Sequence, residues 1–595
     1  MKPFLPIAAG LLILAPCVPA EPVVPREADV CVYGGTASGV MAAVAASREG
    51  ATVILVEPSR WLGGMTGGGI DHLDWGREAA VGGSTHKFLT EGLDDFADRK
   101  PGGNSTYSQT TRIGHSNRTY RERFLKLVED HGIEVIYDHR LGKVQLTDTT
   151  IHSATRQDPA KLREVIRVSP GGSAIQAIWL DHAPVDRTGC PIPEPLAHNA
   201  VHIRARVFID CSYEGDLLAM SGTNYTWGRE SREQYGESLA GVRPNLWLYE
   251  IDPWLEEGDP GSGTIPFVQD RKIGPEGSAD GLTMAYCFRY KFNRRGEGIA
   301  IPEPARYDPA EFELFRRAMR DGVDIYSARS FNRLGQPVID TFKPRQADAG
   351  SRLRPRLPDT NLSRALMTTT IFGSSENYPN GDWATRASIW KFHQEFFCKL
   401  IHFLRTDPVV PAKLRAQARE LTFDRGDFDE TGGWPHQLYV REARRMISDY
   451  VVTQKDLEAK TAPKHSVGLA SYGVDDWSYA TVALDGKVAL QGGEFSILYL
   501  DGGKQNGSYA IPYEAIVPRK RECSNLLVPV CCSASHIAMT SIRMEPVWMI
   551  LGESAGVAAA MAVEEEFPVQ DVPYGRLRHR LLKIGQKLDP LPPVE

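Results

Sequence analysis

The sequence predicts an α/β protein with a Rossmann-like, dinucleotide-binding domain. A short apolar run at residues 30–33 stops at a glycine-rich turn, and an alanine-rich segment at 40–48 follows and ends before Gly50. A second apolar run, 52–56, stops at Glu57. A buried parallel strand, a tight turn, a helix and a second strand in this order are typical of a nucleotide-binding unit.

The glycine-rich turn is the expected phosphate site. In such a turn the first glycine makes the bend, the second lets the backbone approach a pyrophosphate, and the third lets the helix pack on the strand. Thr36 replaces the middle glycine and places a Cβ where the phosphate passes. The pyrophosphate is expected on the amides of the helix N-terminus. The residues expected there are Gly34, Gly35, Thr36, Ala37, Ser38 and Gly39.

Two features after the turn narrow the choice among dinucleotide cofactors. Glu57 comes eighteen residues after Gly39, where an acid accepts the adenosine ribose hydroxyls and favours FAD or NAD over NADP. Five glycines stand in the seven positions 63–69, which would let the backbone run beside a second flat ligand. Trp61, Leu62 and Met65 within or beside them indicate a packed segment and favour FAD.

Composition excludes several classes of protein. The chain has 595 residues, a formal net charge of −7 and no long basic run, so nucleic acid is not an expected partner. Residues 1–20 have the pattern of a cleaved secretory signal, which predicts a secreted or periplasmic location. The longest later apolar stretch, 525–542, is interrupted by polar residues, so no membrane span is expected.

The cysteines do not predict a metal site. Eight remain after the signal, without zinc or iron–sulfur spacing, and buried free thiols are as well supported as disulfides. The adjacent pair Cys531 and Cys532 fits a redox dithiol less well than two small residues closing a buried strand.

Two later segments look like further pieces of the nucleotide domain. A strand-like run at 202–208 leads to Asp210 and then to the stretch Tyr213 to Asp216. Near the end, 525–530 leads to a helix at about 546–564, with Gly552 and Gly556 on a face that must pack closely.

These segments together resemble the secreted FAD-dependent oxidoreductase family, whose flavin domain is of the glutathione-reductase type and is distantly similar to the flavin module of heterodisulfide reductase. Some relatives carry the label xanthan lyase. The resemblance implies bound FAD, with the final helix pointing at the flavin pyrimidine edge and the backbone of Leu141 near the adenine. The matching segments are 32–36, 57–58, 62–65, 208–210, 213–216, 433–445 and 541–546. Beyond the turn and Glu57, the expected cofactor contacts are Pro58, Gly63, Gly64, Met65, Leu141, Asp210, Met544 and Glu545.

Two side chains near the final helix are candidate catalytic residues. His536 suits a general base because imidazole titrates near neutral pH, although a histidine satisfied inside a core turn fits equally well. Arg543 suits a substrate carboxylate or negative charge at N1 of reduced flavin, and the alternative is a structural pair with Glu545 or Glu553.

Residues 434–445 mix aromatic, imidazole and guanidinium groups and are expected to run from an extended piece into a helix. His436 and Arg441 are the candidate catalytic residues of this segment, in a pocket for a polar or sugar-like ligand. The alternative is that the arginines pair with Glu442, Asp449 and other acids on a solvated face, which we expect for two of the three.

The expected organisation is a discontinuous FAD domain with an inserted α+β substrate domain. Its parts are 28–150, 201–222 and 525–572, and the substrate-facing insertion is 223–524, with a helical section at 384–458. The expected activity is hydride transfer between FAD and a small polar substrate, for which a carbohydrate derivative is one candidate, with a further electron donor or acceptor as partner. Two alternatives stay open: a polysaccharide lyase using His436, Tyr439 and Arg441 on a vestigial nucleotide fold, and a non-enzymatic flavin carrier.

Overall fold

A computed structural model describes residues 24–70, 73–92, 116–147, 151–153, 173–243, 246–293, 296–323, 329–331, 366–458, 463–493 and 507–592. The expected signal peptide, 1–20, lies outside these residues.

An eight-stranded mixed sheet forms the nucleotide-binding part, with the order β3-β2-β1-β7-β6-β4-β5 and β18 beside β7. Strands β1, β2, β3 and β18 run parallel to their neighbours, whereas β6, β4 and β5 form an antiparallel extension. The two runs expected first along the chain lie in β1 and β2, which confirms the parallel pair. The strands are β1 (Arg26–Tyr33), β2 (Val53–Val56), β3 (Glu134–Ile136), β4 (His139–Leu146), β5 (Ile151–Ser153), β6 (Ile175–His182), β7 (Ala197–Asp210) and β18 (Leu526–Leu527).

Strand β7 joins the two halves of this sheet. It pairs with β1 along one edge, and on its other edge its first half pairs with β6 and its last residues with β18. The C-terminal ends of β1, β2 and β7 therefore meet at one edge, where ligands of parallel sheets bind.

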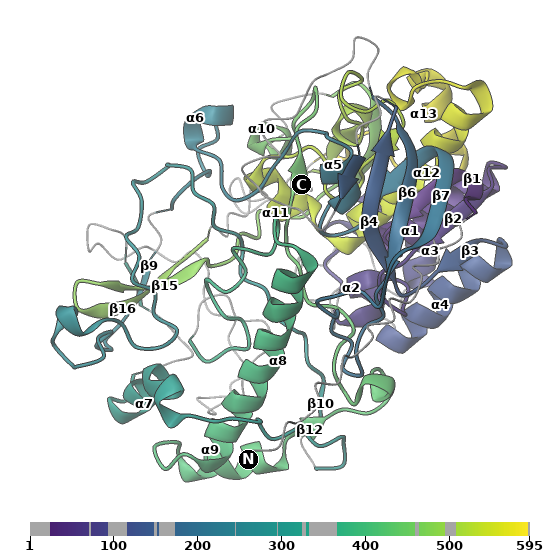
Figure 1. The fold of residues 1–595 in the computed structure, drawn as a ribbon. Helices are drawn as coiled ribbons and strands as arrows, with labels where there is room; N and C mark the ends of the chain where they lie inside the picture. The colour runs from purple at the N-terminus through teal and green to yellow at the C-terminus, as the bar shows by residue number, and fades with distance from the viewer. Residues whose placement is uncertain are drawn as a thin grey trace, which may run out of the picture.

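Two helices with small residues pack against each other beside the sheet (Figure 1). They are α1 (Ala37–Arg48) and α12 (Glu545–Glu565). A Cβ at Gly552 would lie 2.2 Å from the carbonyl oxygen of Ser38, and one at Gly556 would lie 2.2 Å from that of Ala42. The close packing face expected on the final helix is thus confirmed. Among the described residues, α12 alone is long and apolar enough to cross a bilayer, and its apolar window is entirely buried.

The inserted region contains a smaller four-stranded sheet, β11-β9-β16-β15, and the long helix α8, which runs between this sheet and the larger one in Figure 1. These elements are β9 (Leu246–Tyr249), β11 (Arg329–Phe331), β15 (Ala480–Leu484), β16 (Lys487–Gln491) and α8 (Trp383–Thr406). The remaining helices and strands are α2 (Gly64–Gly68), α3 (Gly83–Thr90), α4 (Asn117–Asp130), α5 (Asp216–Met220), β8 (Tyr225–Thr226), α6 (Arg232–Tyr235), β10 (Phe292–Asn293), α7 (Glu313–Arg320), α9 (Ala412–Glu420), β12 (Thr422–Phe423), β13 (Arg445–Met446), α10 (Gln454–Leu457), β14 (Ser466–Ala470), β17 (Tyr509–Pro512), α11 (His536–Ile542) and α13 (Tyr574–Lys583).

One expectation for the insertion is wrong. Residues 434–445 contain no helix, and the helical section expected over 384–458 is interrupted between α9 and α10. The segment stays extended because its backbone pairs with other parts of the chain: the amide of Gln437 donates to Gly68 at 3.0 Å, and that of Tyr439 donates to Cys287 at 2.9 Å.

Candidate cofactor cavity and active site

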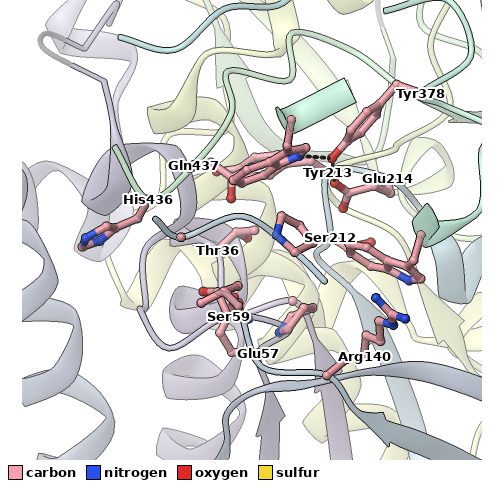
Figure 2. A pocket seen from close by; sticks show the side chains of 18 residues that line it. Thr36, Glu57, Ser59, Arg140, Ser212, Tyr213, Glu214, Tyr378, His436 and Gln437 are labelled. Carbon is pink, nitrogen blue, oxygen red and sulfur yellow. Dashed lines mark hydrogen bonds between the residues drawn. The ribbon is translucent and has the colours of Figure 1, made fainter. Parts of the chain in front are cut away.

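A cavity of about 600 Å³, its open mouth included, lies at the C-terminal ends of β1, β2 and β7 (Figure 2). Its walls come from the glycine-rich turn, the segment after β2, strand β4, the connection between β6 and β7, the loop after β7 and the insertion. The lining residues are Gly34, Thr36, Glu57, Pro58, Ser59, Arg140, Ala183, Val185, Gly189, Pro191, Ser212, Tyr213, Glu214, Tyr378, Trp383, Trp390, His436 and Gln437. Of the expected site residues, this set contains Gly34, Thr36, Glu57, Pro58 and His436.

Thr36 explains the departure from the glycine pattern. It is the N-cap of α1, with φ −62° and ψ 173°, and its hydroxyl accepts a hydrogen bond from the amide of Gly39 at 3.2 Å. The same hydroxyl donates to the carbonyl of Cys211 at 2.8 Å. Threonine is a preferred N-cap residue, so the sequence contained this signal. The side chain stabilises the helix start beside which a phosphate would lie.

The glycines of the turn leave room that no side chain could share. Gly34 has φ +96°, and a Cβ there would lie 2.6 Å from the amide nitrogen of Ser212. A Cβ at Gly39 would lie 1.9 Å from the carbonyl oxygen of Gly34. The turn therefore brings backbone, and not side chains, to the N-terminus of α1, as a pyrophosphate site requires. Gly35, Ala37, Ser38 and Gly39 belong to this turn and helix start but do not line the cavity.

Glu57 lies at the end of β2, as expected. One carboxylate oxygen accepts from the amide of Gly35 at 2.8 Å, and the other accepts from the amide of Ser59 at 2.7 Å. Burial raises the pKa of Glu57 to about 7 despite these hydrogen bonds. Each oxygen keeps a second acceptor position, so the side chain fits the ribose hydroxyls of a dinucleotide. The turn and Glu57 thus fit the adenosine diphosphate half of FAD.

The expected cofactor residues at 63–65 and 544–545 meet beside the start of α12 and do not line this cavity, although Tyr213, which joins them, does. The hydroxyl of Tyr213 accepts from the amide of Met65 at 2.8 Å and donates to Glu545 at 2.9 Å. Thr66 donates to the other oxygen of Glu545 at 2.5 Å. Burial raises the pKa of Glu545 to about 7.

Two neighbours complete this junction. Gly64 has φ +49°, and a Cβ there would lie 2.3 Å from the hydroxyl oxygen of Tyr213. Gly63 precedes it with φ +96°, and Met544 is the N-cap of α12. The structure therefore brings residues 63–65 close to Glu545 through Tyr213, and their contact with FAD stays a prediction.

Leu141 and Asp210 do not line the cavity. The amide of Leu141 donates to the hydroxyl of Tyr33 at 3.1 Å, and the lining residue of that strand is Arg140. Asp210 is fully buried and accepts from the amide and hydroxyl of Ser212 and from the amide of Leu218, at 2.6–3.0 Å. Asp210 therefore shapes the loop after β7 and positions Ser212 in the cavity wall.

His536 lies in a buried ionic network. Its Nδ1 is 2.8 Å from Glu442, and its Nε2 is 2.6 Å from the hydroxyl of Tyr479 and 3.3 Å from Asp476. Burial alone would lower the pKa of His536, but Glu442 and Asp476 outweigh it and raise the pKa to about 10. A protonated histidine is a poor proton acceptor, so this geometry favours the core-turn alternative over the general-base expectation.

Arg543 is the C-cap of α11 and lies just before α12. One of its nitrogens donates to the backbone and side chain of Asp475, each at 2.9 Å, and another donates to the hydroxyl of Tyr439 at 3.3 Å. Its buried Nε has no hydrogen-bond partner among the described residues. The acidic partner is thus Asp475, and not Glu545 or Glu553, and one donor is left for a ligand.

Arg441 is buried against aromatic rings. Its guanidinium lies 3.6 Å from the ring centroid of Trp477 and 4.7 Å from that of Tyr439, and it donates to the carbonyl of Ala285. Burial lowers its pKa. Arg441 does not line the cavity.

The other two arginines of this segment are ion-paired, as expected, but in the interior and not on a solvated face. Arg444 donates to Asp216 at 2.7 Å, and Arg445 donates to Glu230 at 2.5 Å and to Glu442 at 3.2 Å. Both side chains are at most 1% exposed. Charges repeated in a short stretch look the same in sequence whether water or buried acids surround them.

His436 is the one expected catalytic residue that lines the cavity. Its ring stacks on Trp61 at 3.7 Å, and Figure 2 shows the ring directed away from Glu214 and Arg140. Nε2 lies 3.3 Å from Glu430, but neither ring nitrogen makes a hydrogen bond with the described residues. Burial and the charge of Arg121 lower the pKa of His436 to about 2, so the imidazole is neutral.

The second wall of the cavity was not predicted from the sequence. Tyr378, Trp383 and Trp390 come from the insertion, and Glu214 follows β7. Trp383 and Trp390 stand seven positions apart, which places them on one face of a helix, so a signal was present. Nothing in the sequence showed that this face meets the nucleotide domain.

The cysteines follow the buried-thiol alternative. The eight from Cys31 to Cys532 are buried and free in the structure. The part of the chain that is described contains no cluster of three or more histidine, cysteine or acidic side chains arranged for a metal.

The fold and the cavity together define a Rossmann-like protein that binds a flavin dinucleotide. A family model described as FAD dependent oxidoreductase matches residues 29–168 and 196–581. The chain belongs to this family, and its cofactor is FAD. No curated protein matches the sequence.

Three solved structures are among those with similar parts. OxyS anhydrotetracycline hydroxylase from Streptomyces rimosus is 12% identical over 39% of each chain, with a TM-score of 0.22. Thioredoxin reductase of T. acidophilum is 14% identical over 31% of this chain and 35% of its own, with a TM-score of 0.15. THI4 of Thermovibrio ammonificans is 14% identical over 34% of this chain and 66% of its own, with a TM-score of 0.21. This chain spans less than half of the first two proteins, and these TM-scores support no argument about its activity.

Proposed function

We propose that the protein is an exported oxidoreductase that transfers a hydride between FAD and a small polar substrate, for which a carbohydrate derivative is the first candidate. The observation that carries the proposal is the cavity in which Gly34, Thr36 and Glu57 lie beside polar and aromatic side chains of the insertion. FAD supplies the hydride chemistry when bound, and the chain binds and orients the substrate. Export is supported by the signal-like residues 1–20.

Arg543 and Tyr439 are the proposed substrate-contacting residues. They form one hydrogen-bonded pair outside the lining of the described cavity. Arg543 stands two residues before the first residue of α12, whose start the family likeness places at the flavin. Tyr439 and Asp475 raise the pKa of Arg543 against the opposing effect of burial, so the guanidinium stays charged. A charged Nε donor suits an alkoxide or carboxylate of the substrate.

His436 has a different proposed role. A neutral imidazole in the cavity can donate or accept a hydrogen bond, but its lowered pKa makes it a weak base. We assign it to substrate or cofactor orientation. The lyase alternative would need His436, Tyr439 and Arg441 in one pocket, and among these only His436 lines the described cavity.

The test begins with the visible spectrum of the purified mature protein and identification of the flavin released on denaturation. Anaerobic mixing with sugars, sugar acids, polyols and amines follows, with loss of flavin absorbance as the readout. The proposal is supported if one donor class reduces the flavin and if this reduction is lost in Arg543→Ala. The surface variant Arg118→Ala is the control and should retain the reduction.

Two results would overturn it. Lyase activity that persists after removal of FAD would favour the lyase alternative. The flavin-carrier alternative would be favoured if no donor reduced the bound FAD and no acceptor reoxidised its reduced form. Export is tested separately by N-terminal sequencing of protein recovered outside the cytoplasm, where a start near residue 21 is expected.

A further inference from the structure

Three buried arginines meet around one tyrosine, outside the lining of the described cavity. The guanidinium carbon of Arg289 lies 4.8 Å from the ring centroid of Tyr439, and that of Arg441 lies 4.7 Å from the same centroid. Arg543 donates to the hydroxyl of this tyrosine at 3.3 Å. The four residues are at most 8% exposed. We call Arg289, Arg441 and Arg543 the arginine cluster.

The pairing of two distant segments brings the cluster together. Cys287 and Tyr439 form an antiparallel bridge, in which the amide of Tyr439 donates to the carbonyl of Cys287 at 2.9 Å. Arg289 and Arg441 each follow one of these two residues by two positions, and both lie beside the tyrosine ring. Arg543 reaches the same ring from the end of α11. The cluster therefore joins the insertion to the segment that precedes α12.

The guanidinium groups of Arg441 and Arg543 are held by contacts within the protein. That of Arg441 lies 3.6 Å from the ring centroid of Trp477 and donates to the carbonyl of Ala285. One terminal nitrogen of Arg543 donates to the backbone and the side chain of Asp475, each at 2.9 Å. Both groups are thus oriented before a ligand binds, which lowers the entropic cost of binding.

The cluster gathers like charges in the interior. Arginine keeps its charge in proteins. Burial and the charges of the other two arginines lower the pKa of Arg441. The carboxylate of Glu442, the next residue, binds Arg445 and His536 instead. An anionic ligand beside the cluster would offset both the repulsion and the loss of hydration.

The cluster also has an open donor. Nε of Arg543 is buried and makes no hydrogen bond with the described residues, although both terminal nitrogens of this guanidinium do. A buried donor without an acceptor costs free energy that an oxygen atom of a ligand would recover. Guanidinium groups form their strongest hydrogen bonds with carboxylates and phosphates.

We propose that the arginine cluster and Tyr439 bind an oxoanion of the substrate, so that the substrate is a small acid, such as a sugar acid or a sugar phosphate, and not a neutral sugar. The oxoanion fixes the position of the substrate and takes no part in the hydride transfer. The inference rests on the proposed function for the reaction, whereas oxoanion binding can be measured without the reaction.

The test compares acids with neutral molecules of similar carbon skeleton as ligands of the purified, FAD-loaded protein. Isothermal titration calorimetry measures the Kd of gluconate against sorbitol, of galacturonate against galactose, and of glucose 6-phosphate against glucose. In at least one pair, we expect the acid to bind about ten-fold or more tightly than its neutral partner, because charge-assisted hydrogen bonds have that magnitude. The preferred acid distinguishes a carboxylate site from a phosphate site.

Variants assign this preference to the cluster. Arg289→Gln and Arg441→Gln each remove one charge and are expected to weaken the preferred acid by about ten-fold or more, with the neutral partner unchanged. Tyr439→Phe keeps the ring and should weaken the acid less. Arg316→Gln removes an ion-paired charge on α7 and is the matched control, which should bind every ligand as the parent does.

The comparison of acid and neutral ligands on the parent needs no variant, so it decides even if Arg441→Gln does not fold. Equal binding within every pair, or acid binding that is the same in the parent and in folded variants, would overturn the inference. Flavin reduction by neutral donors alone would also overturn it and leave the proposed function in place. Acid binding that depends on the arginines, without reduction of the flavin by any donor, would contradict the proposed function and keep the oxoanion site.

Discussion

The hydroxyl of Tyr213 donates a hydrogen bond of 2.9 Å to the carboxylate of Glu545, from the loop after β7 to the first residue of α12. The same hydroxyl accepts from the amide of Met65 at 2.8 Å. One buried oxygen thus joins three segments that are distant in sequence, at the place where the family likeness expects the flavin.

Removal of this hydroxyl should loosen that junction. Tyr213→Phe leaves the amide of Met65 and one oxygen of Glu545 without their partner, and we expect the free energy of unfolding to fall by about 1–3 kcal/mol. Thermal unfolding of the purified protein measures the loss. The control is Tyr137→Phe, because Tyr137 is only partly buried and its hydroxyl makes no hydrogen bond with the described residues. Equal stability of both variants would contradict the prediction.

The stability of the flavin-free protein should fall as the pH rises from about 4.5 to 7. Burial raises the pKa of Glu545 from 4.5 to about 7, so the folded state holds a proton that the unfolded state releases in this window. The stabilisation is complete below about pH 4.5 and is lost as the pH passes the folded-state value. A difference of about 2.5 between the folded and unfolded pKa of Glu545 corresponds to a change of about 3 kcal/mol at most in the free energy of unfolding.

Glu545→Gln should remove this share of the pH dependence, because an amide does not titrate. Glu57 has a pKa raised to about 7 and Asp210 one raised to about 6, so part of the dependence should remain. Denaturant unfolding at a series of pH values gives the difference between variant and parent. The exposed Glu122→Gln is the control, and a parent-like slope in Glu545→Gln would refute the assignment.

His536 should act as a structural cation. Since its pKa is raised from 6.5 to about 10, its stabilisation is complete below pH 6.5 and is lost as the pH rises towards 10. His536→Gln leaves Glu442 and Asp476 without their shared cation, and we expect a loss of about 3–5 kcal/mol in stability.

The pH–rate profile distinguishes this role from base catalysis. The rate of flavin reduction is measured against pH for the parent and for folded His536→Gln. An inflection near pH 6.5 that is present in the parent and absent in the variant would show that His536 takes up the substrate proton. We expect no inflection that depends on His536 between pH 5 and 8.

The close packing of Gly552 against α1 should hold the start of α1, and with it the phosphate site, in position. A Cβ there would lie 2.2 Å from the carbonyl oxygen of Ser38, in the first turn of α1, so Gly552→Ala must displace one helix. We expect a lower Tm and FAD binding weakened by about ten-fold, since about 1.4 kcal/mol of strain at the site has that effect. Gly575→Ala on α13, where no atom lies within 4 Å of the added Cβ, should change neither. Unchanged FAD binding in Gly552→Ala would show that α12 does not position the phosphate site.

The sequence by itself determined the local units of the nucleotide fold. The apolar runs of β1 and β2, the turn at Gly34, the position of Glu57 and the small-residue face of α12 follow from patterns within short stretches, because strand burial, tight turns and helix packing leave local periodicities. The Thr36 N-cap belongs to the same group, although its role was interpreted only as a lost glycine.

Tertiary structure alone decided the charge of His536 and the second wall of the cavity. The sequence around His536 does not show that Glu442 and Asp476 will surround its side chain. The pKa of His536 depends on those two partners, which lie far away in the sequence. Likewise Trp383 and Glu214 line one cavity only because the insertion folds back onto the sheet. Long-range contacts set electrostatics and cavity shape, and they leave no period in the sequence.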